Sequence, residues 1–169
     1  DTMIFHLGMS GRWRIDPEEL GTHDHLIVGV DSGHILSLND PRRFGSVDLV
    51  PTADIDTWPP FAAMGPEPLG PDFTARHLQQ ALAGRIASIK LLLLDQRIVA
   101  GLGNIYVCEA LNMAGIAPGR QGGKIGLKRL ERLVEAIRTV LLAAIDAGGS
   151  TLRDYARPDG ELGYFAKQW

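Results

Sequence analysis

Residues 95–118, DQRIVAGLGNIYVCEALNMAGIAP, join two predicted helices through a turn that contains two glycines. The apolar run at 89–94 predicts a buried helix before the turn, and 105–114 carries helix-forming residues after it. Asn104 is expected to cap the second helix, because asparagine is favoured at that position. A helix start behind a glycine-rich turn can bind an anion, and an ordinary helix corner that binds nothing has the same pattern.

Composition and charge indicate a globular chain without an overall attraction to nucleic acid. Hydrophobic residues make up 45% and charged residues 22% of the 169 residues, and the formal net charge is −3. The basic residues are partly grouped, apart from the acidic stretches 16–19 and 54–72. No segment reaches the roughly 20 apolar residues that span a bilayer. Cys108 is the single cysteine, which excludes an internal disulfide and a multi-cysteine metal site and suits a reducing cytoplasm.

The first 50 residues predict antiparallel β structure. Asp31-Ser32-Gly33 is a hairpin signal, and a turn at 8–11 follows the first strand. The expected strands are 2–7, 12–15, 26–30, 34–38 and 44–50. Short strands with polar turns indicate part of a β-sandwich whose other strands are missing.

The remaining residues predict a linker and a helical domain. Residues 51–72 are the expected linker, because they hold six of the ten prolines. Residues 73–169 predict helices at 73–83 and 127–147, followed by a mobile glycine-rich loop at 148–164. The long helix is expected to bury Leu127, Leu130, Val134, Ile137, Leu141 and Ala144. Its outward-facing arginines are expected to be Arg129, Arg132 and Arg138.

Four segments of the chain carry a family resemblance. LLLLDQRIVAGLGNIYVCEALNMAGIAP at 91–118 resembles the helix–two-turns–helix motif of the formamidopyrimidine-DNA glycosylase family, which includes endonuclease VIII. FHLGMSGRWRI at 5–15, NDPRRFG at 39–45 and GGSTLRDYARPDGELGYF at 148–165 agree in the family's order. The resemblance implies an α+β fold, in which the C-terminal part of an antiparallel β-sandwich at 1–50 precedes the mostly helical DNA-binding domain.

Met9 is predicted to lie at the exposed tip of a glycine-flanked turn. Arg42 and Phe44 follow the predicted turn Asn39-Asp40-Pro41 and share this hairpin-tip character, although Phe44 taken alone would be assigned to the core. A methionine and a flat ring can fill a gap in a base stack, and a guanidinium can hydrogen-bond base edges. A glycosylase must flip its target base out of the duplex, so such wedges are chemically useful. The resemblance implies these roles for the three residues.

His6 and His23 match DNA-contacting histidines of the family. A histidine in an apolar strand or a loop is more often structural. The cluster His23-Asp24-His25 is also a weak metal signature, and no metal site is predicted. The resemblance implies that His6 contacts a backbone phosphate and that His23 contacts DNA.

Lys90 and Asn104 match residues of the family that contact DNA phosphates. An amide at a helix start can hold the DNA backbone in place without distinguishing the base sequence. The family usually carries a basic residue four places before this lysine, where the chain has Ile86. Arg85 beside it is the expected substitute. The loop residues predicted to wrap a flipped 8-oxoguanine through their backbone amides are Ser150, Thr151, Leu152, Arg153, Asp154 and Tyr155. A flexible connector has the same composition.

The resemblance implies excision of an oxidised purine followed by strand cleavage at the abasic site. The family's nucleophile is an N-terminal proline amine, which forms a Schiff base next to a glutamate. The chain begins with Asp1-Thr2, so no catalytic residue is predicted within it, and both ends are expected to be cuts. The family's zinc ribbon needs four cysteines. Zinc is therefore expected in the full-length protein and no cofactor in this chain.

The predicted function is base-excision DNA repair in the bacterial cytoplasm and nucleoid. The expected partner is damaged double-stranded DNA, with no membrane and a monomeric protein. The oxidised-purine enzyme is favoured over an endonuclease VIII-like enzyme for oxidised pyrimidines, which usually lacks the Phe44 equivalent and the 148–164 loop. A non-catalytic DNA-binding module and a helical structural protein remain as alternatives.

Overall fold

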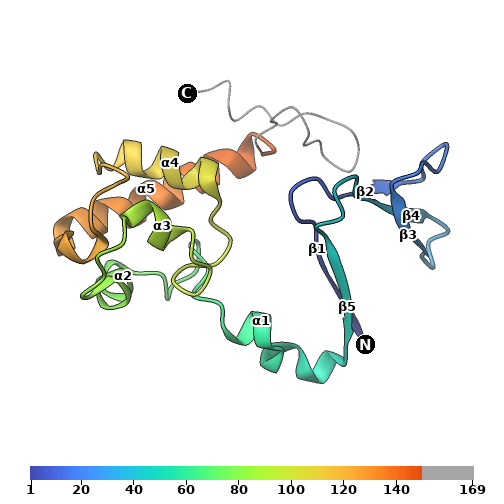
Figure 1. The fold of residues 1–169 in the computed structure, drawn as a ribbon, viewed down its shortest axis with the longest axis horizontal. Coiled ribbons are helices and arrows are strands. Elements are labelled where there is room, and N and C mark those ends of the chain that lie inside the picture. Colours follow the sequence, from blue (N-terminus) through green and yellow to red (C-terminus); the bar gives the residue numbers. More distant parts are fainter. Residues whose placement is uncertain (150–169) are drawn as a thin grey trace. The chain divides into compact units, whose positions relative to one another are not determined.

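The structure is a computed structural model that describes residues 1–149 (Figure 1). The predicted base-recognition loop from Ser150 to Tyr155 lies outside the described residues. The chain divides into two compact units, one containing Asp1–Ile55 and the other Asp56–Ile145. The boundary between them falls inside the proline-rich segment 51–72. Within residues 1–149, none of the helices combines the length and the apolar character of a membrane span.

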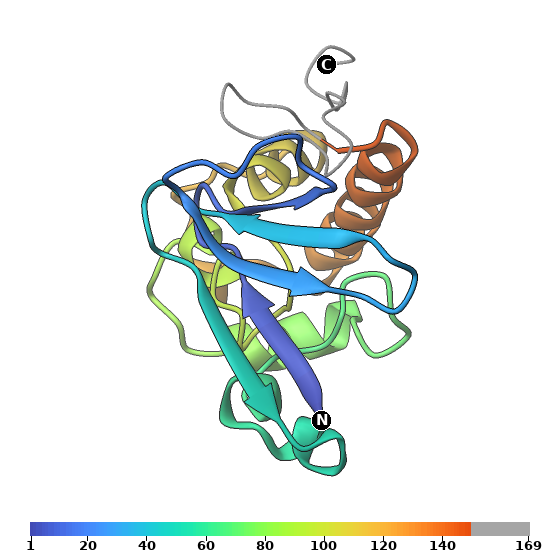
Figure 2. The same cartoon turned by 90° about the vertical axis from the view of Figure 1, so that its right-hand side faces the viewer.

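The first unit contains two antiparallel sheets, whose strands can be followed in Figure 2. The two-stranded sheet pairs β1 (Thr2–His6) with β5 (Ser46–Val50). The three-stranded sheet has the order β2 (Arg12–Ile15), β4 (Ile35–Asn39), β3 (Asp24–Gly29). The predicted antiparallel strands and the hairpin around residues 31–33 are confirmed, with strand ends shifted by up to two residues.

Two connections run between these sheets at the same end. The first leads from β1 to β2, and the second leads from β4 to β5. Since His6 pairs with Ser46 and Arg12 pairs with Asn39, both connections start and finish next to each other. Strand pairing therefore brings the turn at 8–11 and the loop at 40–45 together.

A buried carboxylate fastens the three-stranded sheet. Asp24 has a side chain only 1% exposed. It accepts hydrogen bonds from Ser37 Oγ at 2.7 Å, Asn39 Nδ2 at 3.1 Å and Arg14 Nη1 at 3.0 Å. The Ser37 hydroxyl and then the Gly21 amide are the main causes that lower the pKa of Asp24 to about 2. Asp24 thus stabilises the sheet as an ion.

The proline-rich segment is more ordered than the sequence predicts. It contains a 3-10 helix, η1 (Thr52–Thr57), and a single α-helical turn, α1 (Pro59–Ala62). Prolines are tolerated in the first turn of a helix because the N–H groups there have no helical partner. The Trp58 and Phe61 rings pack edge to face, with centroids 5.1 Å apart.

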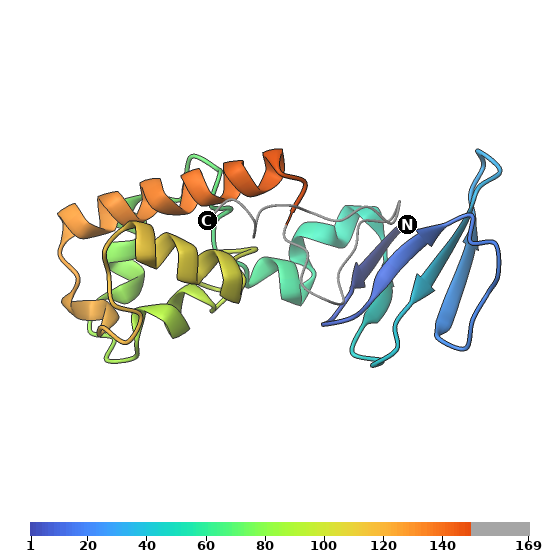
Figure 3. The same ribbon diagram turned by 90° about the horizontal axis from the view of Figure 1, so that it is seen from above.

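The second unit is helical. Its elements are α2 (Ala75–Leu82), α3 (Ile89–Leu93), α4 (Asn104–Met113), the 3-10 helix η2 (Gly122–Lys124) and α5 (Leu127–Asp146). Figure 3 shows α5 extending along α4. The core side chains that are almost fully buried include Phe73, Leu78, Ile89, Leu93, Val107, Leu111, Leu133 and Ile137. Of the predicted α5 face, Leu130, Val134, Ile137 and Ala144 are buried, whereas Leu127 and Leu141 are half-buried.

The predicted outward orientation of Arg138 is wrong. Its guanidinium is partly buried and donates to the carbonyl oxygens of Pro68 at 3.3 Å, Gly70 at 3.0 Å and Phe73 at 3.0 Å. These carbonyls belong to an irregular segment before α2, where no helix supplies partners for them. A cation reaching from α5 therefore satisfies them and ties this segment to the core.

Candidate nucleic-acid interface

The corner between α3 and α4 ends in an uncapped helix start. Gly103 is the N-cap residue of α4, with φ −110° and ψ 175°, and no side chain accepts a hydrogen bond from the first turn. The prediction that Asn104 caps this helix is wrong. Asn104 is one residue further along, inside the first turn, where its exposed amide oxygen lies 3.9 Å from Cys108 Sγ. The helix N-terminus is thus open to an external anion.

Gln96 shapes the turn that leads to this helix start. Its Oε1 accepts from the Gly101 amide at 2.7 Å, and its Nε2 donates to the Leu102 carbonyl at 3.1 Å. Its own carbonyl accepts from the Gly65 amide at 2.8 Å. A Cβ added to Gly65 would lie 2.6 Å from the carbonyl carbon of Ile98, so only glycine fits there. Sequence reasoning missed both Gln96 and Gly65.

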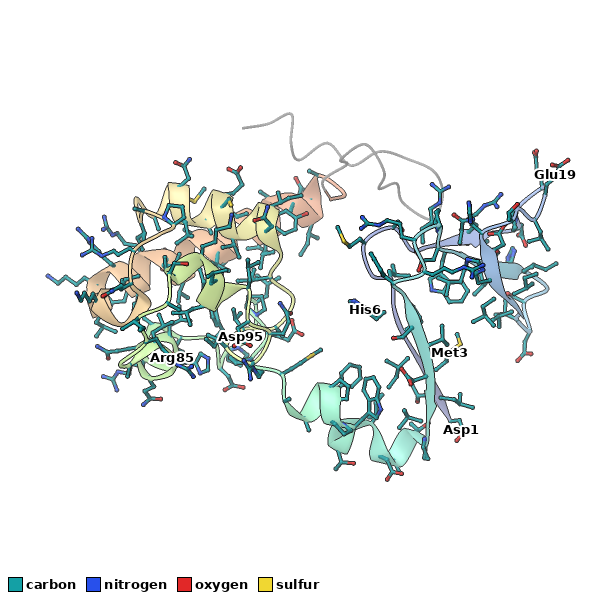
Figure 4. The ribbon with its side chains drawn as sticks, in the orientation of Figure 1. Asp1, Met3, His6, Glu19, Arg85 and Asp95 are labelled. Atoms are coloured by element: carbon teal, nitrogen blue, oxygen red, sulfur yellow. The ribbon has the colours of Figure 1, made fainter. Side chains whose placement is uncertain are left out.

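Three basic residues of the helical unit, Arg85, Lys90 and Arg97, precede the start of α4 in the sequence. Arg97 donates through Nε and Nη2 to Asp95, each at 2.8 Å, and these contacts lower the pKa of Asp95 to about 2. Arg85 is exposed, and its charge acts on the same carboxylate (Figure 4). Lys90 is half-buried in α3, and its backbone amide donates to the Pro118 carbonyl. The Arg97 guanidinium is therefore paired with Asp95, whereas the side chain of Arg85 is exposed to solvent.

In the β unit, the turn at 8–11 and the loop at 40–45 carry exposed side chains. Met9 is 70% exposed and Phe44 is 57% exposed, as expected for hairpin tips. The Arg42 guanidinium carbon lies 4.9 Å from the centroid of the Phe44 ring, a cation–π contact. Arg43 between them has φ 56°, a left-handed conformation, and both of its neighbours are exposed.

The two histidines assigned to DNA also lie at the surface. His6 is the exposed last residue of β1 and is labelled in Figure 4. His23 is exposed, with its ring centroid 6.4 Å from that of His25. Among residues 1–149, no group of three or more potential metal ligands gathers. The carboxylate of Asp24, the residue between the two histidines, is hydrogen-bonded to side chains of β2 and β4.

Asp40 begins the loop at 40–45 and is hydrogen-bonded to the turn at 8–11. It is 4% exposed, and its carboxylate accepts from the Gly45 amide at 2.8 Å and from Ser10 Oγ at 2.9 Å. These hydrogen bonds, the Gly45 amide first, lower the pKa of Asp40 below its ordinary value. Sequence reasoning treated Asp40 only as a turn residue. The candidate residues thus form two sets, with His6, Met9, His23, Arg42 and Phe44 in the β unit and Arg85, Lys90 and Asn104 in the helical unit.

Comparison with models of protein families shows to which family this chain belongs. Residues 64–156, more than half of the chain, match the formamidopyrimidine-DNA glycosylase H2TH domain. The chain belongs to the formamidopyrimidine-DNA glycosylase family. Residues 1–47 also match the N-terminal domain of formamidopyrimidine-DNA glycosylase. The resemblance recognised from the sequence is therefore confirmed.

Relatives of this family agree along the chain. A formamidopyrimidine-DNA glycosylase of Rhizorhabdus wittichii is 71% identical over 169 residues, covering 100% of this chain and 63% of the relative. One of Novosphingobium aromaticivorans is 70% identical, covering 99% of this chain and 62% of the relative. The chain therefore spans less than two thirds of the length of these relatives.

Solved structures of the family share the fold. The MutM (Fpg) protein of Thermus thermophilus has a TM-score of 0.88 and 38% identity, covering 98% of this chain and 62% of that protein. Lactococcus lactis Fpg in complex with abasic-site DNA has a TM-score of 0.88 and 33% identity, and the match covers 98% of this chain and 61% of that protein. The predicted α+β class is confirmed by this likeness. A zinc ribbon of four cysteines, which the sequence resemblance implies for the full-length protein, cannot be built from this chain's single cysteine, Cys108.

Proposed function

We propose that this chain forms the DNA-gripping surfaces of a base-excision repair enzyme, a glycosylase for oxidised purines such as 8-oxoguanine and formamidopyrimidines. The full-length enzyme would also cleave the strand at the abasic site. The observation that carries the proposal is the pair of exposed tips, Met9 and Phe44, held together in one unit. The DNA complexes of Lactococcus lactis Fpg, including one with Fapy-dG DNA, support damaged duplex DNA as the partner.

The β unit would act on the base stack. When the damaged base leaves the duplex, Met9 and Phe44 fill the gap with a soft side chain and a flat ring. Arg42, whose guanidinium lies against the Phe44 ring, would hydrogen-bond the unpaired partner base with its N–H groups. His6 and His23 contact the backbone beside the lesion. These contacts would favour DNA that is easily unstacked.

The helical unit would hold the sugar-phosphate backbone. The uncapped start of α4 offers backbone N–H groups to a phosphate, and the exposed Asn104 amide can add a hydrogen bond. Lys90 and Arg85 contribute positive charge. Contacts of this kind orient a duplex without reading its sequence, and they weaken as salt is added.

The family resemblance implies that an N-terminal proline amine and its glutamate carry out the chemistry. For residues 1–169 we propose the binding of damaged DNA. The loop at Ser150–Tyr155 is proposed to hold the flipped base. The bacterial relatives support a place near chromosomal DNA in the cytoplasm and nucleoid. A monomer suffices for these contacts.

The test is binding of the 169-residue chain to an abasic-site duplex, measured by fluorescence anisotropy at several salt concentrations. Asn104→Ala and Arg42→Ala are expected to weaken binding by about tenfold each. Matched controls are Asn112→Ala, an exposed asparagine near the other end of α4, and Arg132→Ala, an exposed arginine of α5. Both controls should bind like the unsubstituted chain. Equal affinity of all five proteins, or affinity independent of salt, contradicts the proposal.

A further inference from the structure

The buried carboxylate of Asp40 joins the two exposed loops of the β unit. Oδ1 accepts from Ser10 Oγ at 2.9 Å, and Ser10 is next to Met9 in the turn at 8–11. Oδ2 accepts from the Gly45 amide at 2.8 Å, and Gly45 is next to Phe44 in the other loop. One side chain thus holds a neighbour of each exposed wedge residue.

The backbone of Asp40 reaches a third segment. Its amide donates to the His23 carbonyl at 2.9 Å, and its carbonyl oxygen lies 3.0 Å from His25 Nε2. Asp40 is therefore fixed to the segment that begins β3 as well as to both loops. The backbone next to the exposed His23 ring is held by the same residue.

Close packing makes this arrangement stiff. A Cβ added to Gly45 would lie 3.0 Å from the His6 carbonyl oxygen and 3.1 Å from Asp40 Oδ2. The Arg43 amide also donates to the Asp40 carbonyl at 3.3 Å, closing the loop on itself. The end of β1, the two loops and the start of β3 thus meet at Asp40, with little space for one to move alone.

We propose that Asp40 is a positioning residue that makes Met9, Arg42 and Phe44 act as one preformed wedge. The inference rests on the proposed function, because it assigns a role in damaged-DNA recognition. Asp40 itself is 4% exposed and does not need to touch DNA. Side chains held before binding lose less conformational freedom when they enter a base stack, so the clamp should increase preference for a distorted duplex.

Three substitutions separate the link from the charge. Asp40→Ala removes the side-chain hydrogen bonds to Ser10 and Gly45 together with the weaker ones from the Arg42 and Arg43 amides, and Ser10→Ala removes only the link to the Met9 turn. Asp40→Asn removes the charge but can keep both links: its oxygen can accept from Gly45, and its NH₂ can donate to the Ser10 hydroxyl, which also accepts. Asp48→Ala, at an exposed aspartate of β5, is the matched control.

The readout is the ratio of the dissociation constants for an intact duplex and for the same duplex with an abasic site, measured with the 169-residue chain. Asp40→Ala and Ser10→Ala should each lower this ratio by about three- to tenfold, the effect of one or two lost hydrogen bonds. Asp40→Asn and Asp48→Ala should stay within about twofold of the unsubstituted chain. In the Asp40→Ala background, adding Ser10→Ala should change nothing more, because the link is already absent.

A measurement without DNA tests the clamp separately. Amide hydrogen exchange at Gly45 should become faster in Asp40→Ala and stay slow in Asp40→Asn. The inference is overturned if Asp40→Asn loses the preference as Asp40→Ala does, since charge rather than the link would then matter. It is equally overturned if Asp40→Ala and Ser10→Ala leave the ratio unchanged, or if Gly45 exchange does not respond. An unsubstituted chain without any preference contradicts the proposed function itself, whereas exchange at Gly45 still reports the link.

Discussion

The backbone of Gly8 lies directly against Phe44. A Cβ built on Gly8 would come within 2.8 Å of the Phe44 carbonyl carbon and 2.9 Å of its Cβ, and Gly8 has φ 62°. The pairing of β1 with β5 and of β2 with β4 places the two connections side by side. The contact between Gly8 and Phe44 then fixes how closely Met9 and Phe44 approach.

Gly8→Ala should destabilise the β unit by about 2–6 kcal/mol, since a left-handed conformation and an overpacked contact each cost about 1–3 kcal/mol. Gly33→Ala is the control: Gly33 has φ 86° but no atom within 4 Å of an added Cβ, so it should cost only about 1 kcal/mol. Urea denaturation measures both. Equal losses in the two variants contradict the close contact with Phe44.

Gln96→Ala should destabilise the helical unit by about 1 kcal/mol, because the amides and carbonyls of the turn at 96–102 lose their side-chain partner. It should also weaken binding of duplex DNA, since the start of α4 is then less well fixed. Gln79→Ala, at an exposed position of α2, is the control and should be neutral. The measurements are thermal unfolding and anisotropy titration. Unchanged behaviour of Gln96→Ala shows that the turn does not need this amide.

Arg138→Ala should destabilise the helical unit by about 2–3 kcal/mol, because three carbonyl groups lose a charged donor. Arg138→Lys should restore little, since an ammonium cannot reproduce the planar fork of donors. Arg132→Ala on the same helix should have an effect below about 0.5 kcal/mol. Similar midpoints of urea denaturation for Arg138→Ala and Arg132→Ala contradict the anchoring role.

Stability of the β unit should fall in acid because of Asp24. Its folded pKa, about 2, lies below the ordinary value of 3.8, so its stabilising contribution is complete above pH 3.8 and is lost as pH falls toward 2. Asp24→Asn should be less stable than the unsubstituted chain at neutral pH and should show a smaller loss between about pH 5 and pH 2. Asp48→Asn is the control. Parallel pH profiles for Asp24→Asn and the unsubstituted chain contradict this role.

Asp95 should add less to this acid sensitivity. Its pKa is also lowered to about 2, mainly by hydrogen bonds from Arg97, so the direction of the effect is the same. Its partner Arg97 has a side chain 76% exposed, however, and water screens such a pair. Acid should therefore affect the β unit more than the helical unit, as hydrogen exchange in each unit can measure.

Local patterns predicted the elements well. The glycine and turn residues around 31–33 gave the hairpin, and the 3.6-residue spacing along 127–147 gave α5. Both features depend on neighbours in the sequence, which a single chain displays directly. The exposure of Met9 also followed from its glycine-flanked turn, whereas Phe44 taken alone would have been assigned to the core, and only the family resemblance predicted its exposure.

The errors and omissions concern interactions between distant segments. Arg138 was expected at the surface from the helical spacing of residues 127–147, but it donates to carbonyl groups 65 to 70 residues earlier. Asn104 was expected at the N-cap, where Gly103 already has the extended conformation needed. Asp40 depends on Ser10, 30 residues away, and only the sheet pairing reveals that contact. An aspartate before a proline signals a turn, not which other loop it will hold.

The central claim is that the exposed tips recognise a disrupted base stack while α4 holds the backbone. It is tested most directly by the ratio of affinities for an abasic-site duplex and the intact duplex. Met9→Ala combined with Phe44→Ala should lower that ratio by about tenfold or more, with affinity for intact DNA nearly unchanged. Asn104→Ala should weaken both affinities about equally and leave the ratio unchanged. A ratio that is unaffected by loss of Met9 and Phe44, or that depends on Asn104 alone, contradicts the account.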